Sequence, residues 1–351
     1  MNDYVYEPSY VHPRFRINGN SMDACTLLNA AYDYIKEGKP FEKAIGVFLL
    51  DWFDPKPYVI MKTSGTTGTP KTIQLSKRAM INSALATSVF FKVGANTHAL
   101  HCLPAQYIAG RMMLVRAIII GWDIDVLEPS STPLAGNEKT YDFAAMVPLQ
   151  AEQSLGKLSQ VKKIILGGGK VSSVLSEKLQ PLPVAIWETY AMTETVTHVA
   201  AKRIGETAFT TLPGVKVTTD ARGCLVIDAP KVADMPVVTN DLAEVKDVHR
   251  FTWLGRYDNV INSGGIKLFP EQVEEKLAPY LTQRFFVYGL PDEVLGEKLI
   301  LVVEGSPVTI PDQAYSNLDK YEKPKTILFV NKFAETGSGK VQRGETVAAA
   351  R

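Results

Sequence analysis

The sequence of 351 residues predicts an α/β protein, with a large N-terminal domain of α/β layers that carries a small β-subdomain, followed by a small α+β C-terminal domain. Three observations predict this class. Strand-like and helix-like segments alternate through most of the chain. Between residues 207 and 245 the segments shorten to strands separated by Gly and Pro. After residue 256 the pattern of helices and strands forms a unit of its own, so we place the domain boundary there, giving domains 1–255 and 256–351.

The first predicted elements surround a segment rich in glycine and threonine at residues 63–71. An apolar run at 58–61 predicts a strand before this segment, and the alternation of residues 72–75 predicts a second strand after it. Ser76 is predicted to cap the N-terminus of a helix over residues 77–91. The segment is therefore expected to join two strands, with no helix beginning directly behind it.

The alternation continues further along the chain. Residues 162–166 ("KKIIL") predict a strand, which is followed by a glycine turn at 167–169 and a helix at 172–180. Residues 184–187 ("VAIW") predict the next strand, and residues 188–198 ("ETYAMTETVTH") are expected to be the helix-like segment after it. Such alternation predicts largely parallel strands in the large domain.

The C-terminal unit begins with a helix predicted over residues 271–281. Two strands around a turn are expected within 284–305, then a further helix and a final strand at 326–330. The chain next enters a glycine-rich loop at 335–343. Together these segments predict the compact α+β domain.

Composition and charge exclude several classes of function. The chain has 38 basic and 37 acidic residues and a net charge of +1, so it has no excess of cations for binding nucleic acid. Its cysteines, Cys25, Cys102 and Cys224, are odd in number and lack zinc-site spacing, which favours a reducing cytoplasm. The first residues show no apolar leader, and the apolar run at 112–122 is interrupted by Arg116, so neither a signal peptide nor a membrane span is expected.

Residues 63–71 ("TSGTTGTPK") have the composition of a phosphate-binding loop, with five hydroxyl side chains, two glycines and a lysine. A P-loop would need a glycine where Pro70 stands, and proline has no N–H to offer a phosphate. The anion would instead be held by backbone N–H groups, by the hydroxyl groups and by the charge of Lys71. The alternative is an ordinary flexible hairpin loop, which does not require this set of side chains.

One cation, Arg116, lies within the apolar run that is predicted to form a buried helix. Burial of a guanidinium without a partner costs free energy. Arg116 is therefore expected to pair either with a carboxylate of the protein or with an anionic ligand, and the sequence leaves both alternatives open.

Five separated motifs together resemble the successive core motifs of the adenylate-forming superfamily, which includes acyl- and aryl-CoA ligases, luciferases and adenylation domains. They are residues 63–71, "YAMTE" at 190–194, "TND" at 239–241, residues 255–274 and "TGSGKVQR" at 336–343. The resemblance implies that the chain activates a carboxylic acid with ATP and Mg²⁺ to an acyl-adenylate, with release of pyrophosphate, and then transfers the acyl group to a thiol such as that of CoA. It also implies that the large domain binds ATP and the acid, and that the C-terminal domain is mobile.

The resemblance assigns the parts of a nucleotide site to particular residues. Segment 63–71 would hold the β- and γ-phosphates of ATP. Glu194 would coordinate Mg²⁺, for which a carboxylate is a suitable hard ligand, and Thr193 would bind the α-phosphate. Tyr190 would stack on adenine and Asp241 would accept hydrogen bonds from ribose; outside the set of motifs, they would be a core aromatic and a turn residue. The full predicted ATP-binding set is Thr63, Ser64, Gly65, Thr66, Thr67, Gly68, Thr69, Lys71, Gly168, Gly169, Glu188, Thr189, Tyr190, Asp241 and Arg256.

Further roles are implied for the C-terminal domain. Lys340 resembles the catalytic lysine that bridges the carboxylate and the α-phosphate during adenylation. Asp258 occupies the hinge position, about which the domain would rotate between the two half-reactions. After this rotation, one face of the domain would line the channel for the CoA thiol, and it comprises Ser263, Gly264, Gly265 and Lys267.

The chain departs from the superfamily pattern in three places. Asn240 replaces a usual glycine, and Tyr107 stands where a histidine is common in the acyl-binding segment. The first motif begins at residue 63, so the N-terminal segment is much shorter than in most relatives. The outer helices of the large domain are therefore expected to be missing, or to be replaced by a contact in a homodimer.

The predicted acid-binding residues are Tyr107, Gly110 and Arg116. The segment 110–121 resembles the corresponding part of o-succinylbenzoate–CoA ligases of menaquinone biosynthesis, whose substrate carries an aromatic ring and a second carboxylate. An acid–CoA ligase for this substrate is therefore the leading hypothesis.

Three other functions remain as alternatives to this one. The alternatives are another aryl- or acyl-CoA ligase, a stand-alone adenylation enzyme that loads a carrier protein, and a regulatory nucleotide-binding protein without catalysis. The presence of Lys340, Glu194 and Lys71 argues against the last alternative.

Overall fold

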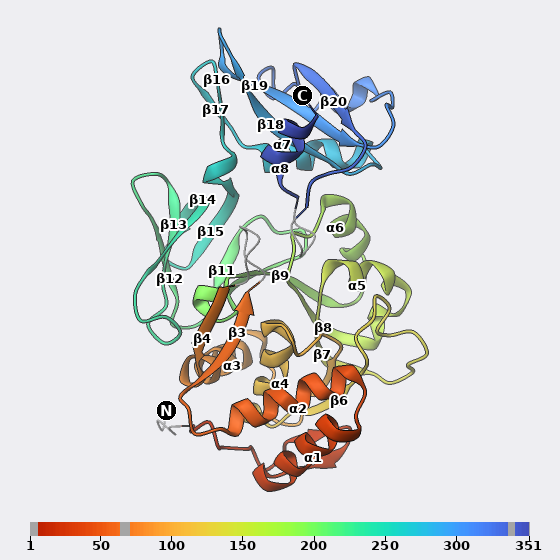
Figure 1. Ribbon diagram of the computed structural model, residues 1–351, viewed down its shortest axis with the longest axis vertical. Coiled ribbons are helices and arrows are strands. Elements are labelled where there is room, and N and C mark those ends of the chain that lie inside the picture. Colours follow the sequence, from red (N-terminus) through yellow and green to blue (C-terminus); the bar gives the residue numbers. More distant parts are fainter. Residues whose placement is uncertain (1–5, 64–70, 336–340, 351) are drawn as a thin grey trace.

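One sheet of 13 strands runs through the large domain of the computed structural model, which describes residues 6–63, 71–335 and 341–350, with the backbone alone at residues 62, 63 and 71. The strand order is β12-β13-β14-β15-β11-β10-β9-β8-β7-β5-β6-β1-β2 (Figure 1). Its strands are β1 (Arg16–Ile17), β2 (Asn20–Ser21), β5 (His98–His101), β6 (Asp123–Val126), β7 (Tyr141–Met146), β8 (Val161–Leu166), β9 (Ala185–Ala191), β10 (His198–Arg203), β11 (Phe209–Thr211), β12 (Lys216–Thr219), β13 (Cys224–Asp228), β14 (Val237–Asp247) and β15 (Arg250–Arg256).

Helices cover both faces of the central strands. Because successive strand residues point to opposite faces, Ala99 and Phe143 pack with α1 to α4, whereas Leu100 and Ala144 pack with α5, η1 and α6. These layers confirm the predicted α/β class. The helical elements are α1 (Ala24–Glu37), α2 (Pro40–Phe53), α3 (Lys77–Phe91), α4 (Ile108–Ile120), α5 (Pro148–Gln153), η1 (Leu155–Gln160) and α6 (Ser173–Leu179), where η denotes a 3₁₀ helix.

The sheet is parallel only in the half that runs from β9 to β1, where β1 pairs in parallel with β6. Strands β6, β5, β7, β8 and β9 pair in parallel, but every pairing from β9 to β12 is antiparallel, so the prediction of largely parallel strands is correct for one half of the sheet. The prediction of a helix-like segment at 188–198 is wrong. Glu188 to Ala191 continue β9, a single 3₁₀ turn, η2 (Thr193–Thr195), follows, and His198 begins β10. The β-branched and aromatic residues of this segment favour strands, and pairing of β9 with β10 satisfies their backbone.

The residues before the first motif form two helices that belong to the core of the large domain. Asp23 caps α1 by accepting a hydrogen bond from the Thr26 backbone N–H at 2.8 Å. α1 and α2 cross closely at Gly46, where a Cβ would lie 2.5 Å from the Ala31 carbonyl oxygen. Trp52, on α2, is fully buried in the same cluster as α3 and α4. The short N-terminal segment therefore contributes two packed helices to the core of the large domain.

The elements on either side of the predicted phosphate loop are as expected. β3 (Tyr58–Thr63) and β4 (Lys71–Ser76) pair antiparallel in register from Tyr58 opposite Ser76 to Thr63 opposite Lys71. The Ser76 hydroxyl accepts a hydrogen bond from the Ala79 backbone N–H at 3.3 Å and caps α3. The prediction of a loop between two strands is confirmed by these flanks, while residues 64–70 lie outside the described part of the chain.

The C-terminal domain has a five-stranded sheet of its own, with β20 parallel to β19. The expected helix before β20 is only the 3₁₀ helix η5, and α8 was not predicted. The chain passes between the two sheets through η3, and the boundary at residue 256 remains a proposal. The elements are η3 (Tyr257–Asn259), β16 (Ile261–Ser263), β17 (Ile266–Leu268), α7 (Pro270–Leu277), η4 (Ala278–Tyr280), β18 (Phe285–Asp292), β19 (Gly296–Glu304), η5 (Asp312–Tyr315), β20 (Thr326–Val330) and α8 (Arg343–Ala349). In the described residues, no helix has both the length and the apolar character that a bilayer span requires.

The buried histidine of β5 makes stability sensitive to acid. His101 is 1% exposed, its Nδ1 has no partner among the described residues, and burial lowers its pKa to about 4. The unfolded chain therefore binds this proton first, and the free energy of unfolding falls as the pH drops from about 6.5 towards 4, by roughly 3 kcal/mol from this residue. We expect His101→Leu to remove this part of the decline. Denaturant unfolding of both proteins between pH 7 and pH 4.5 measures it, and equal pH slopes would contradict the assignment.

Candidate active site

A cavity of about 940 Å³ opens where the carboxyl ends of the parallel strands β7, β8 and β9 meet. Sheets of this class bind ligands at such an edge, because the loops that leave the strands converge there. The wall is completed by α4, β10 and β15, and by Gln272 and Glu275 of α7. Lys170, beside the glycine turn, forms an ion pair with Glu275 at 2.9 Å, so the two domains meet at the cavity.

The glycine turn after β8 presents open backbone to the cavity. Gly168 has a φ of +80°, which a residue with a Cβ rarely adopts, and nothing lies within 4 Å of where a Cβ of Gly169 would stand. At Gly167 a Cβ would lie 2.9 Å from the Thr189 hydroxyl, which donates to the Leu166 carbonyl. The turn is thus held against β9 on one side and leaves space for a flat ligand on the other.

Tyr190 and Asp241 meet across the sheet at the cavity wall. The Tyr190 hydroxyl donates to Asp241 Oδ2 at 2.5 Å, and Arg256 Nη1 lies 3.4 Å from Asp241 Oδ1. Burial and the negative charge of Asp241 raise the pKa of Tyr190, so the phenol stays protonated and acts as the donor. The carboxylate is therefore oriented by two neighbours and retains lone pairs for ligand hydroxyl groups.

Removing the Tyr190 hydroxyl is expected to weaken nucleotide binding while the ring remains. Tyr190→Phe should raise KM for ATP about tenfold, because a hydrogen bond that orients a charged acceptor is lost, and kcat should change less. Tyr141→Phe is a matched control, since Tyr141 also donates to a carboxylate, that of Asp125, away from the cavity. Equal effects of the two variants on KM would show that the Tyr190 contact is only structural.

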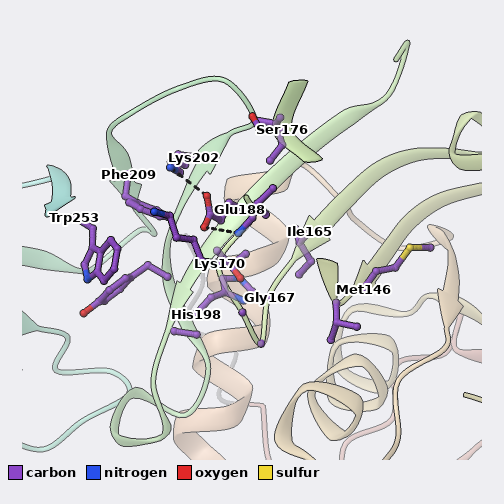
Figure 2. Close-up of a pocket in the computed structure, with 18 of the residues that line it drawn as sticks. Met146, Ile165, Gly167, Lys170, Ser176, Glu188, His198, Lys202, Phe209 and Trp253 are labelled. Atoms are coloured by element: carbon purple, nitrogen blue, oxygen red, sulfur yellow. Dashed lines mark hydrogen bonds and ion pairs between the residues drawn. The ribbon is translucent and has the colours of Figure 1, made fainter. Parts of the chain in front are cut away.

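Glu188 is held at the cavity wall by an ion pair with a lysine that was not among the predicted site residues. Lys202 stands opposite Glu188 in the β9–β10 register, and its Nζ lies 3.1 Å from Glu188 Oε2. Glu188 Oε1 accepts a hydrogen bond from the Val171 backbone N–H at 3.2 Å. Figure 2 shows this carboxylate between its two partners, with His198 lining the same cavity.

Arg116 lies deep in the cavity wall on α4 and is 2% exposed. No carboxylate of the described residues pairs with its guanidinium; its Nη2 lies 3.4 Å from His198 Nδ1 and its Nη1 lies 3.7 Å from Met113 Sδ. Its Nε has no partner within the same described residues. Burial lowers the pKa of Arg116 to about 9, so the group stays charged at neutral pH. Of the two alternatives left open by the sequence, the anionic ligand is favoured.

Several predicted residues do not line the cavity in this conformation. Tyr107 is 63% exposed at the start of α4, and Gly110 packs where a Cβ would lie 2.3 Å from the Pro104 carbonyl oxygen. Glu194 is exposed on η2, whereas Thr193 beside it lines the cavity. Asp258 lies on η3 and accepts a hydrogen bond from the Asn240 side chain at 3.3 Å. The residues predicted for the CoA channel, Ser263, Gly264, Gly265 and Lys267, lie on the hairpin β16–β17, at the end of the molecule away from β9 and α6 (Figure 1).

The predicted phosphate loop and catalytic lysine are outside the described residues. This applies to Ser64, Gly65, Thr66, Thr67, Gly68, Thr69 and Lys340, and to the side chains of Thr63 and Lys71. Within the described residues, no group of three or more His, Cys, Asp or Glu is arranged to hold a metal ion. A Mg²⁺ ion that is bound chiefly by phosphate oxygens and water needs only one protein carboxylate, so the exposed Glu194 fits that demand.

The fold and the cavity define an α/β nucleotide-binding enzyme whose site is completed by a second, smaller domain. The sequence pattern of the AMP-binding enzyme family matches residues 50–231, more than half of the chain, and the chain belongs to this family. The membership expected from the five motifs is thereby confirmed.

Relatives with solved structures or assigned activities resemble most of the chain. A crystal structure of an acyl-CoA synthetase (AMP-forming)/AMP-acid ligase II-like protein from Dyadobacter fermentans is 35% identical, with a TM-score of 0.60, and the match covers 89% of this chain and 95% of that one. A probable 2-succinylbenzoate–CoA ligase of Mycobacterium tuberculosis is 27% identical over 82% of this chain and 83% of its own length. The fold also matches o-succinylbenzoate CoA synthetase (MenE) of Bacillus subtilis in complex with ATP and magnesium ion, with a TM-score of 0.72 at 21% identity, over 82% of this chain and 69% of that one.

Proposed function

We propose that the chain is an AMP-forming acid–CoA ligase that converts 2-succinylbenzoate (o-succinylbenzoate), ATP and CoA into the CoA thioester, AMP and pyrophosphate. The observation that carries this proposal is Arg116, a charged guanidinium in the cavity wall without a carboxylate partner among the described residues. The same cavity is also lined by apolar side chains, among them Ile108, Ala109 and Val196. A substrate with an aromatic ring and a second carboxylate suits both features, and the names of the relatives support the choice of acid.

In the first half-reaction a carboxylate oxygen of the acid attacks the α-phosphorus of ATP, and the bond to pyrophosphate breaks. Catalysis then consists chiefly of positioning and of stabilising charge on phosphoryl oxygens. Gly168, Gly169 and Tyr190 would hold the base, Asp241 the ribose, and Thr193 the α-phosphate, with Lys340 supplied by the C-terminal domain. Mg²⁺, with Glu194 as protein ligand, would neutralise charge on the leaving pyrophosphate.

In the second half-reaction the CoA thiol attacks the carbonyl carbon of the adenylate, and AMP leaves with the electrons of the broken C–O bond. Ser263, Gly264, Gly265 and Lys267 lie away from the cavity in this conformation, so the proposal requires the C-terminal domain to rotate about Asp258. Gly264 and Gly265, with φ of +59° and +81°, would let the thiol arm pass close to the backbone.

The proposal places the reaction in the cytoplasm, where ATP and CoA are supplied. All three cysteines are unpaired, which agrees with a reducing compartment. The expected homodimer is also part of the proposal, and light scattering of the purified chain measures the mass that tests it.

Pyrophosphate release from ATP with a panel of acids, in the presence and absence of CoA, tests the function. The panel pairs 2-succinylbenzoate with two analogues that each lack one carboxylate, 2-butyrylbenzoate and 4-oxo-4-phenylbutanoate. We expect 2-succinylbenzoate to give the highest kcat/KM, and mass spectrometry to detect its CoA thioester. Release of pyrophosphate without a thioester would indicate a carrier-protein acceptor, and a higher kcat/KM for another acid would overturn the choice of substrate.

A further inference from the structure

The neighbour of Arg116 in the cavity wall, His198, is a side chain that the proposed chemistry does not use. The residue is 4% exposed, with Nδ1 3.4 Å from Arg116 Nη2 and Nε2 3.3 Å from Thr87 Oγ1. The Thr87 hydroxyl donates its proton to the Ser83 carbonyl at 2.9 Å. These contacts join α4, β10 and α3 through one imidazole.

The hydrogen-bond pattern fixes the protonation state of His198. Because the Thr87 proton points to Ser83, its oxygen can only accept, so His198 Nε2 carries the proton and donates to it. Nδ1 is then a lone-pair acceptor for Arg116, which has only donors. Burial and the charge of Arg116 both lower the pKa of His198, in agreement with a neutral ring.

The backbone before His198 is held in an unfavourable conformation that places the ring. Val196 has a φ of +67°, uncommon for a β-branched residue, and the Thr197 backbone N–H donates to the Thr195 carbonyl at 2.7 Å across it. The Thr195 hydroxyl donates to the Thr197 carbonyl at 3.0 Å, which secures this tight turn. The turn lies between η2 and β10, and it brings His198 to the start of the strand beside Arg116.

A neutral hydrogen-bond acceptor such as His198 leaves the charge of Arg116 in place, whereas a carboxylate would not. A carboxylate in this place would orient Arg116 but would also neutralise it, and the cavity would lose its affinity for anions. A neutral imidazole orients one N–H of the guanidinium and leaves the full positive charge for a ligand. The other N–H groups meet only Met113 Sδ among the described residues.

We propose that His198 is a positioning residue that orients Arg116 without neutralising it, and thereby makes the cavity selective for acids with a second carboxylate. This inference rests on the proposed function, because it names the determinant of its substrate class. His198 acts by accepting a hydrogen bond from Arg116. The contact with Thr87 fixes the tautomer in which Nδ1 is free to accept this bond.

The test compares two amides that each replace one ring nitrogen. In His198→Asn the side-chain oxygen can take the place of Nδ1 and accept from Arg116, whereas in His198→Gln the amide reaches the place of Nε2 and the acceptor for Arg116 is lost. Calorimetry measures binding of 2-succinylbenzoate, 2-butyrylbenzoate and 4-oxo-4-phenylbutanoate to each protein without turnover. We expect His198→Gln to lower the preference for the dicarboxylate about tenfold, and His198→Asn to retain it within about threefold.

Two further variants separate selectivity from packing. His198→Asp should abolish the preference, because the new carboxylate neutralises Arg116. Thr87→Val removes the acceptor for the Nε2 proton and should also lower the preference, while Thr87→Ser should restore it; Thr87 does not line the cavity. Equal loss of affinity for all three acids in the Asn and Gln variants would overturn the inference and leave His198 as a core residue.

The same data distinguish failure of the inference from failure of the proposed function. If the parent protein binds 2-succinylbenzoate with the predicted preference but releases no pyrophosphate from ATP, the proposed function fails and the inference stands. If the parent protein releases pyrophosphate but binds the dicarboxylate no more tightly than the two analogues, the inference fails. An unchanged preference in His198→Asp also overturns it.

Discussion

Replacement of Lys340 by alanine is expected to lower the rate of adenylate formation about a hundred- to a thousandfold, the usual effect of removing one group that stabilises transition-state charge. The superfamily resemblance gives Lys340 the task of bridging the acid carboxylate and the α-phosphate, where negative charge accumulates as pyrophosphate leaves. No lysine or arginine of the described residues in the C-terminal domain lines the cavity, where α7 contributes Gln272 and Glu275. Pyrophosphate release in a single turnover measures the effect.

The second half-reaction provides the internal control. Thioester formation from a preformed adenylate and CoA should continue at close to the parent rate in Lys340→Ala, because Lys340 would serve only the first step. Lys332→Ala removes an exposed lysine of the same domain and should change neither rate. Equal loss of both half-reactions in Lys340→Ala would assign the residue a structural role and would contradict the proposed alternation of the domain.

The nucleotide half of the site was assigned through the resemblance of its motifs to the adenylate-forming superfamily. The glycine turn after an apolar strand was a local signal for Gly168 and Gly169, whereas Tyr190 was expected in a helix-like segment and lies on β9. β8 and β9 are parallel neighbours that end at the same edge of the sheet, so the fold brings these residues together. Asp241 joins them from β14. Its hydrogen bond with Tyr190 could not be predicted, because the sequence does not reveal the order in which the strands lie in the sheet.

The acid half of the site was harder to predict, because it depends on one segment whose secondary structure was predicted wrongly. Residues 188–198 were expected to be helix-like, which would place His198 four residues after Glu194 on a common face. In the structure β10 turns back along β9, so Lys202 faces Glu188 and His198 reaches Arg116, 82 residues earlier in the chain. The β-branched residues of "TVTHV" (195–199) were the available signal for a strand, but a strand of six residues carries little periodicity.

Replacement of Arg116 is expected to lower kcat/KM for 2-succinylbenzoate about ten- to a hundredfold, because a charge-assisted hydrogen bond of roughly 1.5–3 kcal/mol is lost. Arg116→Met keeps much of the side-chain volume in the wall of α4, so the cavity changes in charge more than in shape. The effect should be confined to acids that carry the carboxylate that Arg116 contacts. The monocarboxylic analogue that lacks this carboxylate should be affected little. The identity of that analogue shows which carboxylate of 2-succinylbenzoate Arg116 contacts.

Thermal stability separates this role from an internal ion pair. No carboxylate of the described residues pairs with Arg116, so Arg116→Met removes a buried charge and the melting temperature should hold or rise. Arg111→Met is the matched control on the same helix: Arg111 donates to the Ala105 carbonyl at 2.9 Å and packs over the Phe48 ring, and it does not line the cavity. That variant should melt at a lower temperature and keep the ratio of activities between the acids. An Arg116→Met protein that is destabilised, with an unchanged ratio between dicarboxylate and monocarboxylates, would show that Arg116 supports the fold rather than the substrate.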